Sequence, residues 1–187
     1  MCPVVLYGTE PGRHTMAEVP TPAFAEACAR RSASSGKGKA DEAMGNASVD
    51  HVALVVTDLA RSVEFYESIG FAFERHIEFV GPGAEQVTGV GGARLEMAFL
   101  GLGAFRLELI EYDPPGAGRP GAANDIGCAH ICLRVDDIER AYGELAGRGV
   151  RFVSKPHHHP SGVGMVYFAD PDGNLLELLE VRADDAG

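Results

Sequence analysis

The stretch VDHVALVVTDLARS, residues 49–62, has a counterpart later in the chain, CAHICLRVDDIERA, residues 128–141. In both, an apolar run that contains one histidine is followed by an aspartate and, three residues later, by an arginine. The separation between His51 and His130 is also the separation between Asp58 and Asp137. Because this spacing is constant, we interpret the chain as an internal duplication of one structural unit.

Each copy predicts one strand, one helix and three further strands. The valine-rich run after His51 is typical of a largely buried strand. Asp58 is a favourable N-cap for the helix that follows, and Gly70 is a favourable C-cap. The first copy continues with a strand over 71–80, a glycine-rich connection over 81–92 and a hairpin over 93–112 that turns at 101–103. The second copy repeats this order, with its helix over residues 137–146.

The predicted domain boundaries follow from where this regular pattern begins and ends. Residues 1–48 form an N-terminal extension, in which TPAFAEACARR (21–31) predicts a short helix and the small, polar residues 32–48 predict a flexible linker. The duplicated domain covers residues 49–182, followed by a tail over 183–187. Within that domain, module one is 49–112, a proline- and glycine-rich linker is 113–125 and module two is 126–182.

Composition excludes several classes of partner. The chain has 187 residues, a net charge of −11 and 45% hydrophobic residues, enough for one core or two small fused ones. Such an acidic surface repels nucleic acid and anionic membranes, so a small molecule is the expected partner. No apolar run approaches the roughly 20 residues that span a bilayer. The four cysteines form no CxxC pair, which fits a reducing compartment, and we expect a cytoplasmic protein.

Each copy ends in an apolar strand with one embedded acid, Glu108 in LELIEY and Glu177 in LLELLEV. Because alternate residues of a strand share a face, Glu108 is predicted on the face opposite to the apolar residues that pack on the helix. The same reasoning places His51, His130 and Glu177 on the concave face. For the preceding strand it predicts Leu95, Met97 and Phe99 on the helix side, and Arg94, Glu96 and Ala98 on the concave side.

Two histidines and two carboxylates suggest a divalent metal held between the two halves. Neutral imidazole and carboxylate suit Zn, Ni, Co, Mn or Fe(II). A six-coordinate ion would keep two positions open for a substrate that chelates it through two adjacent oxygens. Glu96 is a further candidate base, and Arg94 or Arg106 is a candidate partner for a substrate carboxylate.

Other polar residues near these strands favour simpler interpretations. Glu111 and Glu180 fall on the opposite face and are expected to be solvated strand ends. Cys128 and Cys132 flank His130 and are expected to be small fillers rather than ligands. The run His157, His158 and His159 predicts a solvated loop, with a lid or a proton donor as the alternative.

The duplicated motif also resembles a known family. The two histidine strands, each followed by a D-[LI]-x-R-[SA] helix start, and the closing DPDGNLLELLE (170–180) are similar to the vicinal oxygen chelate superfamily. It includes glyoxalase I, methylmalonyl-CoA epimerase, extradiol dioxygenases, fosfomycin-resistance transferases and bleomycin-binding proteins. The resemblance covers residues 49–182. It implies an α+β fold of two tandem βαβββ modules that form a cup-shaped mixed β-sheet with helices on the outside. It also implies a homodimer and the metal ligands His51, Glu108, His130 and Glu177.

The resemblance predicts a metal-dependent isomerase, epimerase or lyase that abstracts a proton next to a carbonyl through a metal-stabilised enolate or ene-diolate. Glu108 or Glu177 would act both as ligand and as base. Three alternatives stay open. An Fe(II) extradiol-type dioxygenase would use the triad His51, His130 and Glu177. The other two are a thiol transferase of the fosfomycin-resistance kind and a non-catalytic drug-binding protein.

Overall fold

The chain is described in a computed structural model that covers residues 5–6, 17–18, 47–116, 118 and 122–181. It divides into two units, Met1–Val49 and Asp50–Gly187. In the first unit, two short strands, β1 (Val5–Leu6) and β2 (Ala17–Glu18), pair antiparallel. The predicted helix over 21–31 and most of the predicted linker over 32–48 lie outside the described residues. The second unit contains both repeats.

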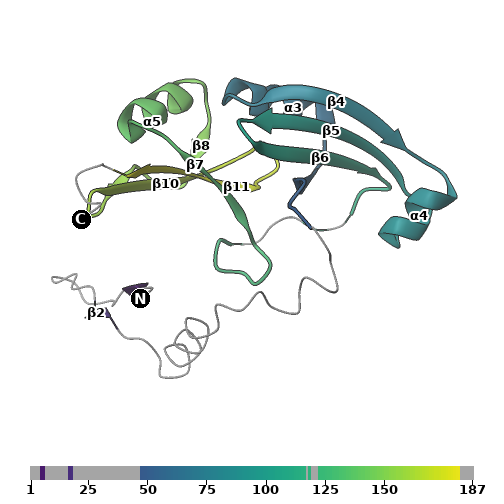
Figure 1. The fold of residues 1–187 in the computed structure, drawn as a ribbon, viewed down its shortest axis with the longest axis horizontal. Coiled ribbons are helices and arrows are strands. Elements are labelled where there is room, and N and C mark those ends of the chain that lie inside the picture. The colour runs from purple at the N-terminus through teal and green to yellow at the C-terminus, as the bar shows by residue number, and fades with distance from the viewer. Residues whose placement is uncertain (1–4, 7–16, 19–46, 117, 119–121, 182–187) are drawn as a thin grey trace. The chain divides into compact units, whose positions relative to one another are not determined.

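Module one forms a four-stranded mixed sheet in the order β3-β6-β5-β4 (Figure 1). β3 is parallel to β6, and the other neighbours are antiparallel. Helix α3 packs on β5 and β6, on one face of this sheet. The elements are β3 (Val52–Val56), α3 (Leu59–Ser68), β4 (Ala72–Phe79), α4 (Pro82–Thr88), β5 (Arg94–Leu102) and β6 (Phe105–Asp113).

Module two repeats this arrangement. Its strands follow the order β7-β11-β10-β8, with β9 also paired to β10, and β7 is parallel to β11. The elements are β7 (His130–Arg134), α5 (Ile138–Gly147), β8 (Arg151–Phe152), β9 (His157–His158), β10 (Val163–Ala169) and β11 (Leu175–Val181). The predicted α+β fold of two tandem βαβββ modules is therefore confirmed, with one hydrogen-bonded sheet in each module.

One predicted connection contains a helix. The glycine-rich residues 81–92 are expected to be irregular, but α4 lies within them. Gly81 precedes the helix with φ 88°, Pro82 occupies its first turn, and Gly89 ends it in the left-handed conformation with φ 70°. Ala84 is the buried residue of α4, and it packs in a small apolar cluster with Ala93 and Leu95. A helix of two turns with one buried residue has too few apolar positions for a helical periodicity to be recognised in the sequence.

Both main helices begin with the same pair of contacts. The carboxylate of Asp58 accepts a hydrogen bond from the backbone N–H of Arg61, as Asp137 accepts one from Arg140. In addition, Glu111 accepts from the N–H of Leu59 at 2.7 Å. These acids satisfy backbone donors that the first helical turn leaves free.

Glu180 does the same in module two, where it accepts from the N–H of Ile138 at 2.9 Å. The prediction that Glu111 and Glu180 lie on the helix side of the sheets is confirmed. The prediction that they are solvated strand ends is wrong, since both hold a helix N-terminus and Glu180 is buried. The sequence alone does not show that the last strand of each module ends next to the first turn of the helix in the same module.

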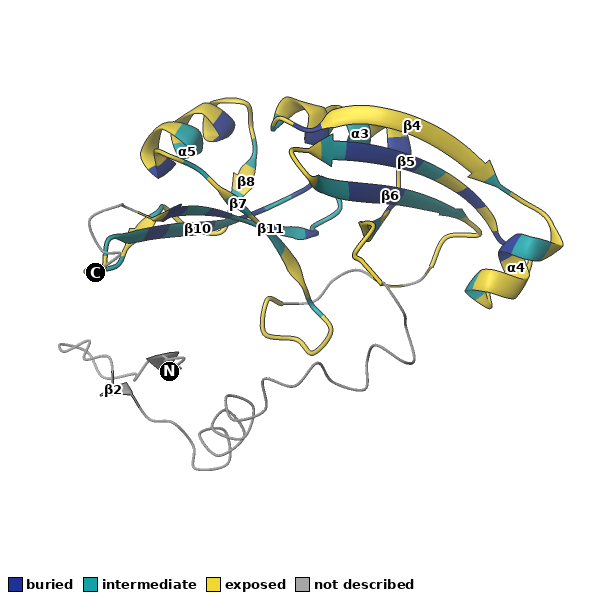
Figure 2. Ribbon diagram, viewed as in Figure 1, coloured by how far each residue is buried: buried dark blue, intermediate teal, exposed yellow. Residues whose placement is uncertain are grey.

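The two modules share one hydrophobic core, visible as the dark segments of β5, β6, β10 and β11 in Figure 2. In each sheet the apolar residues that face the helix contribute to it. The edge strand β4, by contrast, is exposed along nearly its whole length. The buried members from module one are Val56, Leu59, Tyr66, Phe71, Ala98, Leu100, Leu107 and Leu109; those from module two are Ile138, Leu145, Val166, Phe168, Leu176 and Leu178.

The turn between β10 and β11 fastens the modules together. Asp170, fully buried, accepts a hydrogen bond from the hydroxyl of Tyr66 on α3. Asp172 accepts from the backbone N–H and the hydroxyl of Thr57 and forms an ion pair with Arg61 at 2.8 Å. Partial burial raises the pKa of Asp172, but the hydrogen bonds from Thr57 and the ion pair with Arg61 outweigh it and lower the pKa overall. The DPDGN turn of module two thus binds the start and the last turn of α3.

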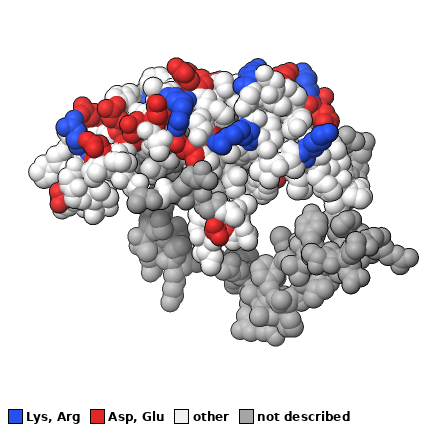
Figure 3. Space-filling model, turned by 180° about the vertical axis from the view of Figure 1, so that it is seen from behind, with Lys and Arg blue, Asp and Glu red and all other residues white. Residues whose placement is uncertain are grey.

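The surface of the described residues mixes both charges. Figure 3 shows lysine and arginine side chains beside aspartate and glutamate on the face that it displays. No helix in the described part of the chain combines the length and the apolar composition that crossing a membrane requires.

Candidate functional site

His51 and Glu108 form the first of two equivalent histidine–glutamate pairs. In the parallel ladder of β3 and β6, Ala53 lies opposite Glu108, and His51, two residues earlier, shares their face. His51 Nε2 is 3.1 Å from Glu108 Oε2. The Glu108 side chain is 9% exposed and the His51 side chain 35%. The carboxylate is therefore shielded by the sheet, while the imidazole is accessible to solvent.

His130 and Glu177 repeat this geometry in module two. Cys132 lies opposite Glu177 in the parallel ladder of β7 and β11, and His130 precedes Cys132 by two residues. His130 Nε2 is 3.1 Å from Glu177 Oε2, with exposures of 40% and 12% for the two side chains. Each of the four residues lies on the face of its sheet opposite the helix side, as strand alternation predicts. We call the two pairs half-site one (His51, Glu108) and half-site two (His130, Glu177).

An aromatic ring supports the histidine in each half-site. Phe99 lies directly opposite Glu108 in β5, and its ring meets the His51 ring edge-to-face at 5.7 Å. Tyr167 holds the corresponding position opposite Glu177, with its ring 5.1 Å from that of His130. Burial and the charge of Glu177 raise the pKa of Tyr167, so its hydroxyl stays protonated. Each imidazole is thus oriented by a ring on the neighbouring antiparallel strand.

The two half-sites do not combine within one chain. Among the described residues, no group of three or more histidine, cysteine, aspartate or glutamate side chains lies close enough to hold a metal ion. The cause lies in the packing of the sheets. The helix-side faces of both sheets contribute to the shared core, so the opposite faces, which carry Glu108 and Glu177, are turned away from it. The set of four metal ligands therefore stays a prediction. Within one chain, its members form two separate histidine–glutamate pairs.

The donor atoms of each half-site nevertheless fit a divalent ion. An imidazole nitrogen and a carboxylate oxygen already converge at 3.1 Å. In half-site one, His51 Nδ1 also lies 2.9 Å from a carboxylate oxygen of Asp50. A carboxylate on the second ring nitrogen holds the proton there and leaves Nε2 free to bind a metal, an arrangement common around metal-binding histidines.

Polar side chains surround half-site one and contact each other in a way that the sequence does not predict. Arg106 contacts Asp50 at 3.2 Å and Glu74 at 3.0 Å, so a chain of contacts runs from Glu74 through Arg106 and Asp50 to His51. The hydrogen bond with His51, opposed by desolvation and aided by Arg106, lowers the pKa of Asp50. The one sequence signal for Asp50 is its position directly before His51, and at the equivalent position module two has Ala129.

Half-site two has a thiol where half-site one has Ala53. Burial against the sheet, followed by the charge of Glu177 and a hydrogen bond to it, raises the pKa of Cys132 to about 11, although the residue is exposed overall. The thiol is therefore neutral near pH 7 when no metal is bound. As an exposed residue, Cys132 is not the buried filler that was expected, and its exclusion from the ligand set stays a prediction.

Glu96 does not belong to this face. In the antiparallel ladder of β5 and β6, Glu96 lies opposite Glu111 and Phe99 lies opposite Glu108. The predicted faces of β5 are therefore wrong: Leu95, Met97 and Phe99 share the face of Glu108, and Arg94, Glu96 and Ala98 share the helix side. The carboxylate of Glu96 contacts His76 at 3.2 Å instead. β5 is apolar on both faces because α4 covers Leu95, so alternation could not identify its sides.

The remaining candidates lie on both faces of the sheets: His157, opposite Met165, shares the face of half-site two, whereas His158 and Arg94 lie on the helix side. His157 and His158 form strand β9 rather than a loop, and both are exposed. His158 contacts Glu139 at 2.7 Å. Of the arginines proposed for a substrate carboxylate, Arg94 pairs with Glu78 at 3.2 Å, and Arg106 is engaged by Asp50 and Glu74.

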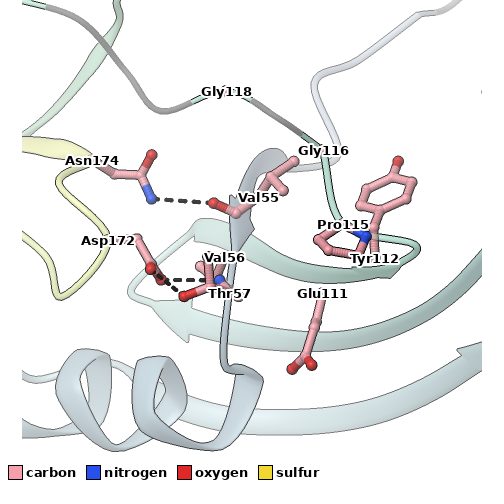
Figure 4. Close-up of a pocket in the computed structure, with 10 residues that line it drawn as sticks. All are labelled: Val55, Val56, Thr57, Glu111, Tyr112, Pro115, Gly116, Gly118, Asp172 and Asn174. Atoms are coloured by element: carbon pink, nitrogen blue, oxygen red, sulfur yellow. Dashed lines mark hydrogen bonds between the residues drawn. The ribbon is translucent and has the colours of Figure 1, made fainter.

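A cavity of about 540 Å³ lies where the end of β3 meets the β10–β11 turn (Figure 4). Asn174 donates to the carbonyl of Val55 at 3.4 Å, and Thr57 donates to Asp172. None of the four half-site residues is among those that line it, which identifies it as a feature of the module junction. The lining residues are Val55, Val56, Thr57, Glu111, Tyr112, Pro115, Gly116, Gly118, Asp172 and Asn174.

Residues 48–178 match the model of the Glyoxalase/Bleomycin resistance protein/Dioxygenase superfamily. The chain belongs to this superfamily. The match spans both modules and both half-sites, and it confirms the family resemblance of the duplicated motif.

Individual members of the superfamily are similar along most of the chain. A 2-epi-5-epi-valiolone epimerase from Actinomyces sp. is 35% identical over 74% of this chain and 82% of its own length. Human mitochondrial methylmalonyl-CoA epimerase is 28% identical, covering 70% of this chain and 72% of its own. The crystal structure of a glyoxalase family protein from Bacillus cereus superimposes with a TM-score of 0.66, at 27% identity, over 74% of this chain and 98% of that one.

Proposed function

We propose that the protein is a metal-dependent isomerase, epimerase or lyase that moves a proton on a carbon next to a carbonyl. The observation that carries this proposal is the repeated half-site, in which a shielded carboxylate and an accessible imidazole converge at 3.1 Å in both modules. The repeated acids Asp58 and Asp137 hold backbone donors of a helix, whereas each half-site pairs a carboxylate with an imidazole that stays accessible to solvent.

The residues of the half-sites divide the chemistry between binding and proton transfer. His51 and His130 would bind the ion through Nε2, and Glu108 and Glu177 through a carboxylate oxygen. A divalent ion supplies positive charge for the oxygen on which negative charge develops when the neighbouring carbon loses a proton. One of the two glutamates accepts that proton while the electron pair stays on the substrate. Returning the proton to the opposite face of the same carbon inverts it, and returning it elsewhere isomerises the substrate.

The similarity to two epimerases favours proton transfer over the other reactions of the superfamily. The test is incubation of the protein in D₂O after loading it separately with Zn, Ni, Co, Mn and anaerobic Fe(II). The probes are 2-epi-5-epi-valiolone, methylmalonyl-CoA and a thiohemiacetal of glutathione. Deuterium bound to carbon in one of these supports the proposal. Lack of exchange with every ion, together with oxygen uptake by the Fe(II) protein on a catechol, would establish a dioxygenase instead.

We further propose that the working site is shared between two copies of the chain. Each half-site offers two donors, fewer than the three protein ligands of a catalytic metal site. Half-site one of one protomer and half-site two of its partner together supply two imidazoles and two carboxylates. A symmetric homodimer would contain two such sites, because the exchange is reciprocal.

Mixing two inactive variants should restore half of the metal sites. The first variant carries His51→Ala and Glu108→Ala, and the second carries His130→Ala and Glu177→Ala. In a mixed dimer, half-site two of the first variant meets half-site one of the second, and one complete site forms. We expect each variant alone to bind little metal and the mixed dimer to bind about one ion, measured by mass spectrometry of the intact complex.

The matched control mixes the first variant with a chain that carries all four substitutions, from which no complete site can form. Mixed dimers of the two variants that bind no more metal than this control would contradict the shared arrangement.

A further inference from the structure

The arginines of the described residues fall into two groups. Six of them are engaged by the protein itself: Arg61, Arg94, Arg106 and Arg140 contact carboxylates, and Arg148 and Arg151 donate to backbone carbonyls. Arg75 and Arg134 have no hydrogen bond or ion pair with any described residue. Both lie on the half-site face of their sheet, since Arg75 lies opposite Phe99 and Arg134 follows Cys132 by two residues along β7.

Arg75 is held beside half-site one. It lies on β4, and its guanidinium carbon is 4.2 Å from the centre of the Phe99 ring. The same ring meets the His51 imidazole at 5.7 Å. The separation between the guanidinium carbon and the imidazole centre cannot exceed these two distances together. Phe99 therefore positions both a metal-binding candidate and a free cation.

The stacking of Arg75 leaves its hydrogen-bonding capacity unused. A cation–π contact engages the flat face of the guanidinium, while its five N–H donors point outward in the plane. Those donors form a fork that matches the two oxygens of a carboxylate or phosphate. The side chain of Arg106, on the same face, is already shared between Asp50 and Glu74. On the face of half-site one, Arg75 is thus the arginine whose N–H donors are available to bind an anion.

We propose that Arg75 binds an anionic group of the substrate, a carboxylate or a phosphate separate from the oxygens that chelate the metal. The proposal rests on the proposed function, because it places the reacting carbon at half-site one. It narrows the substrate to an anion. An unpaired arginine fits this role in a protein of net charge −11, whose overall field repels anions and whose site therefore needs a local cation to hold one.

The test compares two ligands that differ only in the anion. Malate and 2-hydroxybutyrate share the hydroxyl and carboxylate that chelate a metal, but malate has a second carboxylate where 2-hydroxybutyrate has a methyl group. Calorimetry on the Zn-loaded protein should show that malate binds about tenfold more tightly, the effect of a charge-assisted hydrogen bond. Arg75→Gln should abolish this difference and leave the affinity for 2-hydroxybutyrate unchanged. Arg75→Lys should retain part of it, because the charge remains without the planar fork.

Arg94→Gln is the matched control, because Arg94 lies on the other face and is paired with Glu78. It should keep the full preference for malate. If Arg75→Gln also keeps it, or weakens both ligands equally, the role proposed for Arg75 is overturned.

A second measurement is independent of the metal. In the metal-free protein, inorganic phosphate should shift the NMR signal of the Arg75 side-chain Nε–Hε group more than that of Arg94. An Arg75 signal that does not respond would overturn the proposal even if the Zn-loaded protein is active. A responding signal in a protein that binds no metal would preserve the anion site while the proposed function fails.

Discussion

Replacement of His130 by alanine is expected to remove most of the bound metal and nearly all turnover. The imidazole of His130 is one of the two metal ligands that module two would contribute. Without it, Glu177 would lose the nitrogen that now lies 3.1 Å from its carboxylate oxygen. Loss of a residue that merely supports a ligand already weakens metal binding roughly 10–100-fold. For the ligand itself we expect a loss of affinity of at least about 100-fold.

The measurement is elemental analysis of dialysed protein, combined with a competition titration against a chelator of known affinity. His158→Ala is the control, since His158 lies opposite Gly164 on the helix side of the sheet and contacts Glu139 rather than a half-site residue. Circular dichroism should show that both variants keep the wild-type content of helix and strand. A His130→Ala protein that retains the metal content of the wild type would remove His130 from the ligand set.

The second large effect is expected on stability, from Asp170→Ala. Asp170 is fully buried and accepts hydrogen bonds from the Tyr66 hydroxyl, the Asn174 side chain and the backbone N–H groups of Asp172 and Asn174. Burial, followed by the charge of Asp170 and the hydrogen bond to it, raises the pKa of Tyr66, which therefore stays protonated as a donor. Alanine would leave these donors in the interior without an acceptor.

Each unsatisfied buried donor costs about 1–3 kcal/mol, so we expect Asp170→Ala to lower the free energy of unfolding by about 3 kcal/mol or more. For a chain of this length that corresponds to a fall in Tm of roughly 6–12 °C, measured by calorimetry. Asp136→Ala, at an exposed residue, is the control and should stay within about 0.5 kcal/mol of the wild type. If Asp170→Ala unfolds at the wild-type temperature, the DPDGN turn does not fasten the modules.

The elements that the sequence predicted correctly are those whose signals are local. Asp58 and Asp137 cap helices three residues before the N–H groups that they accept from, and this spacing can be recognised without a structure. The face of Glu108 follows from alternation along its strand, and that of Glu177, whose strand has leucines on both sides, follows from the equivalence of the two copies. The two histidines could be assigned to the same faces because the repeat gave each assignment a second, independent copy.

The errors concern residues whose surroundings come from distant segments. Alternation predicts the wrong face for Glu96, because α4 covers one side of β5 and the apolar residues there resemble those of the helix side. Glu111 and Glu180 hold the helix starts of α3 and α5, tens of residues away along the chain. Arg75 has no signal of its own in the sequence, because only the pairing of β4 with β5 brings it over Phe99.

By itself, the sequence determined the duplicated α+β architecture and the two histidine–glutamate pairs, because periodicity, capping and repetition are properties of short segments. Only the tertiary structure decided that these pairs stay apart within one chain. That outcome depends on which faces of the two sheets bury apolar area together. The helix sides do so in a single core, and this packing leaves each half-site on a face that is turned away from the core.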